Sequence, residues 1–150
     1  MRFFWANIAA IALLASPASF SSGVGDAPAT YSLDGKTFYG KIRARGLLGL
    51  FAKKSVLRFE GQLFSWSSGE DFRPAAYETR EENGKIIFTA HAVGNEGAYA
   101  DDYVDWRGEY DGESLSNVTA VWTRAQGGGD WLHDLLLPQT VTFSFKPAKP

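Results

Sequence analysis

Residues 75–93, AAYETREENGKIIFTAHAV, decide the fold of this chain. An Asn-Gly pair at 83–84 separates two segments in which apolar or small residues alternate with polar ones. Alternation with a period of two is typical of β-strands with one buried face, and Asn-Gly favours a hairpin because both residues tolerate a positive φ. The stretch therefore predicts two antiparallel strands joined by a tight turn.

The same pattern recurs on both sides of this hairpin. Residues 37–45, TFYGKIRAR, place Phe38, Gly40, Ile42 and Ala44 on one side of a strand and Tyr39, Lys41, Arg43 and Arg45 on the other. Five further segments read as strands: SVLRFE (55–60), QLFSWSS (62–68), YVDWRGEY (103–110), SLSNVTAVWTR (114–124) and TVTFSF (140–145). Eight strands and no long helix are therefore expected.

The connections between these strands alternate in length. Three are tight and centred on glycine, at 60–62, 82–84 and 111–113, and four are long, over 46–53, 69–75, 94–101 and 125–138. Alternate connections of an up-and-down meander lie at opposite ends of the sheet. The sequence thus predicts an all-β, eight-stranded antiparallel meander that closes into a barrel, with tight turns at one end and long loops at the other. Such a barrel is either filled by side chains or holds one small ligand.

A meander of eight strands whose first connection is a long apolar segment, GLLGLFAKK at 46–54, resembles the calycin group of lipocalins and fatty-acid-binding proteins over residues 31–146. The stretches YETREENGKIIFTA (77–90) and WRGEYDGESLSNVTAVWTR (106–124) resemble a group of small exported bacterial proteins of uncharacterised function. These resemblances imply a calycin-like barrel and an exported protein, and they imply no chemistry.

The first 23 residues, MRFFWANIAAIALLASPASFSSG, have the form of a secretory signal. Arg2 precedes an apolar run over 8–15, which is shorter than the roughly 20 residues that span a bilayer, and small residues follow at 16–18. We expect a signal peptide over 1–18, a flexible lead-in over 19–30, one barrel domain over 31–146 and a frayed tail over 147–150. Together with the absence of cysteine, this indicates a periplasmic or secreted bacterial protein.

Charge is balanced overall but uneven along the chain. Without residues 1–18, 14 basic and 17 acidic residues remain, which argues against a nucleic-acid binder. Seven basic and no acidic residues lie between Lys36 and Arg58, whereas seven acidic residues and only Arg107 lie between Glu96 and Glu113. These two regions either offset each other's charge or form a functional electrostatic patch.

The segment ARGLLGLFAKKS (44–55) is an apolar stretch between basic residues, and it lies in the first long connection. The seventh connection brings GGGDWLHDLLLP (127–138) to the same open end of the barrel. The apolar segment is a structural lid, the gate of an apolar cavity, or a surface that docks on a membrane or protein. The ligand-binding residues predicted here are Arg43, Arg45, Leu48, Phe51, Lys53, Lys54, Trp106, Trp131 and His133, and the predicted cavity walls are Phe38, Ile42, Leu57, Trp106 and Phe143.

No enzymatic motif is present, and no catalytic residue, metal or cofactor is expected. His91 is expected to be a hydrogen-bonded structural residue, and the acidic loop that contains Glu96, Asp101, Asp102 and Asp105 is expected to be solvated rather than a calcium site. We expect a binding module for a small hydrophobic or amphipathic molecule. The alternative is a solid barrel whose apolar rim docks on an envelope protein or a membrane; the bulk of the inward residues argues against a large cavity.

Overall fold

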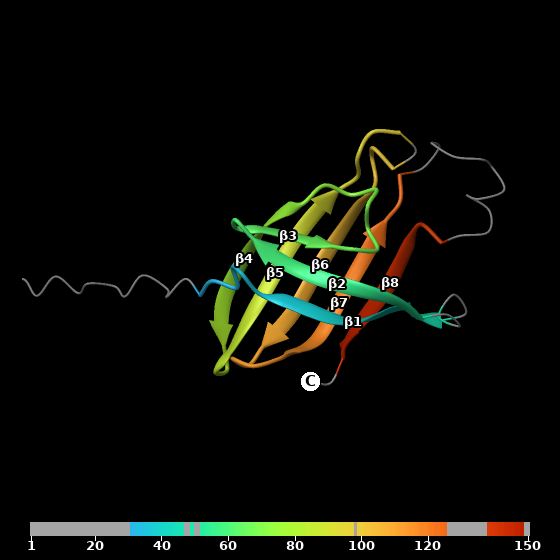
Figure 1. Cartoon of the computed structure of the whole chain (residues 1–150). Helices are drawn as coiled ribbons and strands as arrows, with labels where there is room; N and C mark the ends of the chain where they lie inside the picture. The colour runs from blue at the N-terminus through green and yellow to red at the C-terminus, as the bar shows by residue number, and fades with distance from the viewer. Residues whose placement is uncertain (1–30, 47–48, 50–51, 98, 126–137, 149–150) are drawn as a thin grey trace, which may run out of the picture.

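The computed structural model describes residues 31–46, 49, 52–97, 99–125 and 138–148. They form one closed antiparallel barrel in which each strand pairs with its neighbours in the chain and β8 pairs with β1 (Figure 1). The strands are β1 (Thr37–Ala44), β2 (Ala52–Glu60), β3 (Leu63–Trp66), β4 (Ala75–Glu82), β5 (Lys85–Val93), β6 (Tyr103–Tyr110), β7 (Leu115–Thr123) and β8 (Thr140–Pro147). This confirms the predicted eight-stranded meander, an architecture compatible with a calycin-like fold.

The tight turns have the backbone that the sequence predicts. Gly61 and Gln62 have φ angles of 59° and 62°, and Asn83 and Gly84 have φ angles of 53° and 74°. Two consecutive positive φ values mark a two-residue hairpin turn whose twist matches that of the strands. All three tight turns lie at one end of the barrel, here called the floor, and the long connections lie at the other end, here called the mouth (Figure 1).

The turn between β6 and β7 is held by a side chain. The Asp111 carboxylate accepts hydrogen bonds from the backbone N–H groups of Ser114 at 2.8 Å and Glu113 at 2.9 Å. These bonds favour the ionised carboxylate and lower the pKa of Asp111 below its ordinary value of 3.8, the bond from Ser114 being the largest cause. The Asp111 side chain therefore stabilises the turn to which it belongs. The glycine-centred sequence pattern alone does not predict these hydrogen bonds.

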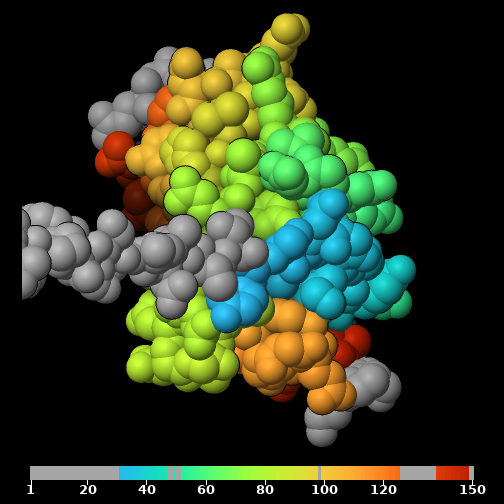
Figure 2. Space-filling view, turned by 90° about the vertical axis from the view of Figure 1, so that its left-hand side faces the viewer, coloured from blue at the N-terminus to red at the C-terminus, as the bar shows by residue number. Residues whose placement is uncertain are grey.

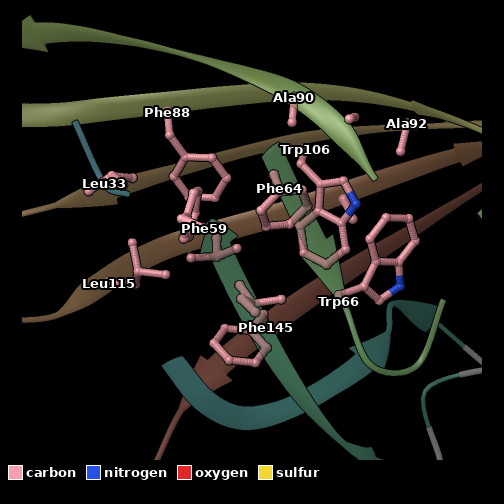
Figure 3. Close-up of a cluster of buried hydrophobic side chains, with 14 of the residues drawn as sticks. Leu33, Phe59, Phe64, Trp66, Phe88, Ala90, Ala92, Trp106, Leu115 and Phe145 are labelled. Carbon is pink, nitrogen blue, oxygen red and sulfur yellow. The ribbon is translucent and has the colours of Figure 1, made fainter. Parts of the chain in front are cut away.

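Aromatic side chains fill the half of the barrel near the floor. Phe59, Phe64 and Phe88 are fully buried (Figure 3). The Phe59 ring lies 5.1 Å between centroids from each of Phe64, Tyr77 and Phe88, and 6.0 Å from Phe38. This half of the barrel is therefore a packed core with no room for a ligand.

The floor is closed by residues 31–36, which precede the first strand. In the space-filling view this blue segment lies between the lime β4–β5 turn and the orange β6–β7 turn (Figure 2). Leu33 is completely buried, and its N–H lies 3.2 Å from the Tyr77 hydroxyl, to which it donates. Gly35 donates its N–H to the Phe59 carbonyl at 2.7 Å. Residues 31–36 thus seal the barrel at the floor.

The strand boundaries lie within two residues of the predicted ones except at the start of β2, which begins at Ala52 instead of Ser55 and therefore includes Lys53 and Lys54. β8 extends to Pro147, one residue into the tail predicted for 147–150, and the Ala148 N–H donates to the Tyr39 carbonyl at 2.7 Å. No helix with the length and apolarity of a bilayer span occurs in the part of the chain that the structure describes.

Three lysines lie side by side on the outer face. Lys41 of β1 is directly opposite Lys54 of β2 and Lys146 of β8, and all three side chains are exposed. Like charges directly opposite each other on a sheet destabilise it, and neither β1 nor β8 contains an acidic residue that would offset them. Two of the basic residues that the sequence concentrates over 36–58, Lys41 and Lys54, therefore form a row with Lys146 across three strands.

Replacing Lys41 by glutamate is expected to raise the free energy of unfolding by about 1 kcal/mol, because two repulsive pairs become attractive. Chemical denaturation at low ionic strength measures the gain, which should shrink as salt is added. Arg43→Glu is the matched control, since Arg43 lies opposite the uncharged Ala52 and Ser144. Equal effects of the two substitutions would show that the lysine row carries no repulsion.

Candidate functional site

A cavity of about 300 Å³ occupies the mouth half of the barrel. It is bordered by the mouth ends of β1, β2, β3, β6, β7 and β8 and by the connections after β3 and β5. Six aromatic side chains make up much of its wall: Trp66, Phe72, Tyr99, Trp106, Trp122 and Phe143. The barrel is therefore solid at the floor and hollow at the mouth.

The cavity exists because small and large inward residues alternate around the barrel at this level. The strand register places five residues in one inward row, from β5 through β8 to β1: Ala90, Trp106, Ala120, Phe143 and Ala44. Ala120 and Ala44 border the cavity beside the rings of Trp106 and Phe143, whereas Ala90 does not border it. Near the floor the corresponding space is filled by Phe59, Phe64 and Phe88. Inward alanines are thus the sequence signal for the cavity.

The aromatic walls form a connected arc. Ring centroids are 5.4 Å apart for Trp66 and Phe72, 6.2 Å for Phe72 and Tyr99, and 6.0 Å for Tyr99 and Trp122. Trp66 and Trp106 approach to 5.1 Å at an interplanar angle of 55°. Such tilted contacts are favourable for aromatic pairs, so the walls support one another before any ligand binds.

Asp102 fixes one side of this arc. It is only 5% exposed, and its carboxylate accepts hydrogen bonds from Trp122 Nε1 at 2.9 Å and from the Ala125 N–H at 2.8 Å. Its backbone carbonyl accepts the Gly94 N–H at 2.8 Å. The expectation that Asp102 belongs to a solvated acidic loop was wrong, because these donors hold the carboxylate inside the mouth.

The remaining acidic residues do not gather into a metal site. The part of the chain that the structure describes contains no group of three or more His, Asp or Glu side chains placed to hold a metal ion. Asp105 lies on the outer face, with Oδ1 2.7 Å from Nδ1 of the exposed His91. His91 is therefore hydrogen-bonded as expected, on the outer surface of the barrel rather than at the cavity.

Trp106 is the most deeply buried polar group of the wall. It is 2% exposed, and its Nε1 finds no hydrogen-bond acceptor among the described residues. The indole nitrogen lies on the side of the ring that faces Ala92 and Trp66, toward the mouth (Figure 3). Trp122, by contrast, donates its N–H to Asp102. One unpaired N–H donor is thus buried in the cavity wall.

Two charged side chains of opposite sign line the cavity as well. Lys53 lies opposite Ile42 on the inner face of β2, and Asp71 belongs to the connection after β3. Both residues are exposed. An apolar and aromatic pocket with a charged rim can accommodate an amphipathic molecule whose polar end faces water.

The structure separates the residues that the sequence grouped together as a ligand-binding site. Lys53 and Trp106 line the cavity. Arg43 and Lys54 lie on the outer face, and Arg45 is exposed just past the end of β1, where its N–H donates to the Thr142 carbonyl at 2.7 Å. Leu48, Phe51, Trp131 and His133 lie outside the described residues. Of the four basic residues predicted to bind a ligand, Lys53 is therefore the one that lines the cavity within the described ranges.

Three of the five predicted wall residues, Ile42, Trp106 and Phe143, border the cavity. Phe38 and Leu57 do not: Leu57 is fully buried in the core, and the Phe38 ring packs on Phe59 and Tyr110 near the floor. The sequence missed the aromatic residues Trp66, Phe72, Tyr99 and Trp122, which lie at strand ends or in the long connections.

Comparison of the chain with protein-family models, with curated proteins and with solved structures gives no match.

Proposed function

We propose that the protein is an exported binding module of the calycin type that holds a small hydrophobic or amphipathic molecule in the mouth cavity. The single observation that supports this function is the change in filling along the barrel axis. Phenylalanines pack the floor half, whereas an alanine–aromatic alternation leaves about 300 Å³ open at the mouth. A preformed apolar pocket with a few polar groups is the usual form of a small-molecule site.

The size of the cavity limits the ligand. Pockets for small molecules span about 300–1,000 Å³, so this one lies at the lower bound of that range. The packed core beneath it, with Phe59, Phe64 and Phe88 fully buried, leaves no channel toward the floor for a long chain. A compact ring compound fits this space better than an extended acyl chain.

The binding proposal is tested with naphthalene, a compact apolar ring compound. Titration of the protein with naphthalene, followed by isothermal calorimetry or tryptophan fluorescence, should show saturable binding. Ala120→Leu fills the cavity from β7 and should weaken binding at least about tenfold, since steric exclusion removes the contacts. Ala44→Leu places a larger side chain in the same cavity from β1 and should likewise weaken naphthalene binding.

Ala76→Leu is the matched control, because Ala76 is exposed on β4 and does not border the cavity. Its affinity for naphthalene should equal that of the unaltered protein. Thermal unfolding of each variant verifies that the barrel is intact. Failure of the unaltered protein to bind naphthalene would overturn the proposed function. So would an affinity of both Ala120→Leu and Ala44→Leu equal to that of the unaltered protein.

A further inference from the structure

The basic residues of the strands are gathered on one side of the barrel. Strands β7, β8, β1, β2 and β3, which are consecutive around the barrel, contain six lysine or arginine residues and one acidic residue, Glu60. Strands β4, β5 and β6 contain five acidic residues and three lysine or arginine residues. The ion pairs found among the described residues all lie on these last three strands. Charge is thus separated around the barrel, although the whole chain has a net charge of −2.

We propose that the outer face of β8, β1 and β2, here called the basic face, docks on the surface of a bilayer that contains anionic phospholipids. Its cations are Lys41, Arg43, Lys54 and Lys146, with Arg45 just past the end of β1, and all five residues are exposed. None of them forms an ion pair with another described residue. The proposal concerns the outside of the barrel and does not depend on the mouth cavity.

The spacing of these cations favours a surface over a single anion. β8, β1 and β2 lie side by side (Figure 1), and neighbouring strands are about 4.8 Å apart, so the lysine row spans about 10 Å. Arg43 lies two residues along β1 from Lys41, a further distance of about 7 Å. One phosphate or carboxylate group cannot contact cations spread over this area. A bilayer surface presents many phosphates, and its attraction adds up over the basic residues that reach it.

Tyr39 favours a bilayer over a dissolved polyanion. Its side chain is 66% exposed, and it lines one groove on the basic face together with Lys41, Lys54 and Lys146. Tyrosine is enriched where membranes meet water, and lysine stems lie along apolar surface while their ammonium groups stay in the polar layer. A nucleic acid or an acidic polysaccharide offers negative charge without an apolar layer beneath it. A bilayer matches both the cations and the exposed ring.

The lysine row also allows docking to be separated from folding. Lys41→Glu is expected to stabilise the barrel, as argued above, because it removes the repulsion from Lys54 and Lys146. The same substitution should weaken docking, because it places a negative charge in the middle of the basic face. Unfolding therefore cannot explain a loss of bilayer binding in this variant.

The first experiment measures sedimentation of the protein with vesicles of equal parts phosphatidylglycerol and phosphatidylcholine at low ionic strength. The unaltered protein should bind these vesicles and should be released as salt is added. Lys41→Glu should weaken binding at least about fivefold. Vesicles of phosphatidylcholine alone measure any binding that does not depend on charge, including that of the apolar residues 8–15.

Arg80→Glu is the matched control, because it makes the same change in net charge on the other side of the barrel. Arg80 is an exposed residue of β4, and β4 lies four strands away from β8 in the closed barrel. This variant should bind the anionic vesicles within about twofold of the unaltered protein, since Arg80 does not face the bilayer. Equal weakening by the two substitutions would show that net charge, rather than the basic face, governs binding.

A second experiment identifies the face that touches the bilayer. The chain contains no cysteine, so Ser144→Cys on β8 or Ala76→Cys on β4 provides one position for an environment-sensitive fluorophore. Ser144 lies opposite Arg43 of the basic face, whereas Ala76 is exposed on the far side. On addition of the anionic vesicles, the emission of the probe at position 144 should shift to shorter wavelength, and that of the probe at position 76 should not.

The outcomes decide the proposal independently of the mouth cavity. No greater binding to the anionic vesicles than to phosphatidylcholine alone, or equal binding by Lys41→Glu and the unaltered protein, would overturn it. Binding of dextran sulfate without binding of the anionic vesicles would assign the basic face to a dissolved polyanion instead. Naphthalene titration of Lys41→Glu should match the unaltered protein in each case, because Lys41 does not line the cavity.

Discussion

Replacing Phe59 by alanine is expected to lower the free energy of unfolding by about 3–5 kcal/mol. Phe59 is 1% exposed, and its ring contacts four other aromatic rings, those of Phe38, Phe64, Tyr77 and Phe88. The substitution removes the shared partner of these rings and leaves a cavity that the closed barrel cannot collapse to fill. Denaturant unfolding followed by circular dichroism measures the loss.

A loss of this size is a large part of the roughly 5–15 kcal/mol by which a domain is usually stable. Leu63→Ala is the control: Leu63 is an apolar residue of the adjacent strand β3, and it is 43% exposed. Its truncation should change stability by about 0.5 kcal/mol or less. A similar loss for both variants would mean that Phe59 is not the centre of the core.

The second large effect is expected for Asp102→Ala, which should destabilise the protein by about 3 kcal/mol because two donors lose a charged acceptor. The Trp122 Nε1–H and the Ala125 N–H would both be left without the carboxylate that now accepts from them. Since Trp122 lines the cavity, naphthalene binding should weaken in the same variant. Denaturant unfolding and calorimetric titration measure the two effects.

Asp105→Ala provides the comparison with an acidic residue only three positions away. Asp105 pairs with His91 on the outer face, where the side chains of both residues are more than half exposed. Exposed pairs of this kind contribute about 0–1 kcal/mol, and naphthalene binding should be unaffected. If Asp105→Ala were as destabilising as Asp102→Ala, the buried carboxylate would have no special role at the mouth.

The architecture could be predicted because its signals are local. The positive φ angles of the β4–β5 turn occur at Asn83 and Gly84, two residue types that tolerate them. The alternation of apolar with polar residues can be seen within the single strand β1. Alternate short and long connections then determine which loops share an end. None of these inferences needs knowledge of contacts between distant segments.

The composition of the site was harder to predict, because it depends on the register across strands. Successive residues of a strand face opposite sides of the sheet, so the alternation in β1 already indicates that Ile42 faces inward and Arg43 outward. Arg43 nevertheless lies near the mouth end of β1. Only the pairing of Ala120 with Trp106 and of Phe143 with Ala120 and Ala44 shows where space remains. Leu33 was missed for another reason: it precedes the first strand and belongs to no periodic pattern.

The closed floor also determines the orientation of the barrel when the protein is attached to a solid support. Tyr31 donates its hydroxyl hydrogen bond to Glu81 near the β4–β5 turn, and the Ala148 N–H bonds to Tyr39 near the start of β1. Both positions lie at the floor. A linker, an affinity tag or a solid support joined at Tyr31 or Ala148 therefore departs from the end opposite the cavity, and an immobilised barrel keeps its entrance turned toward the solution.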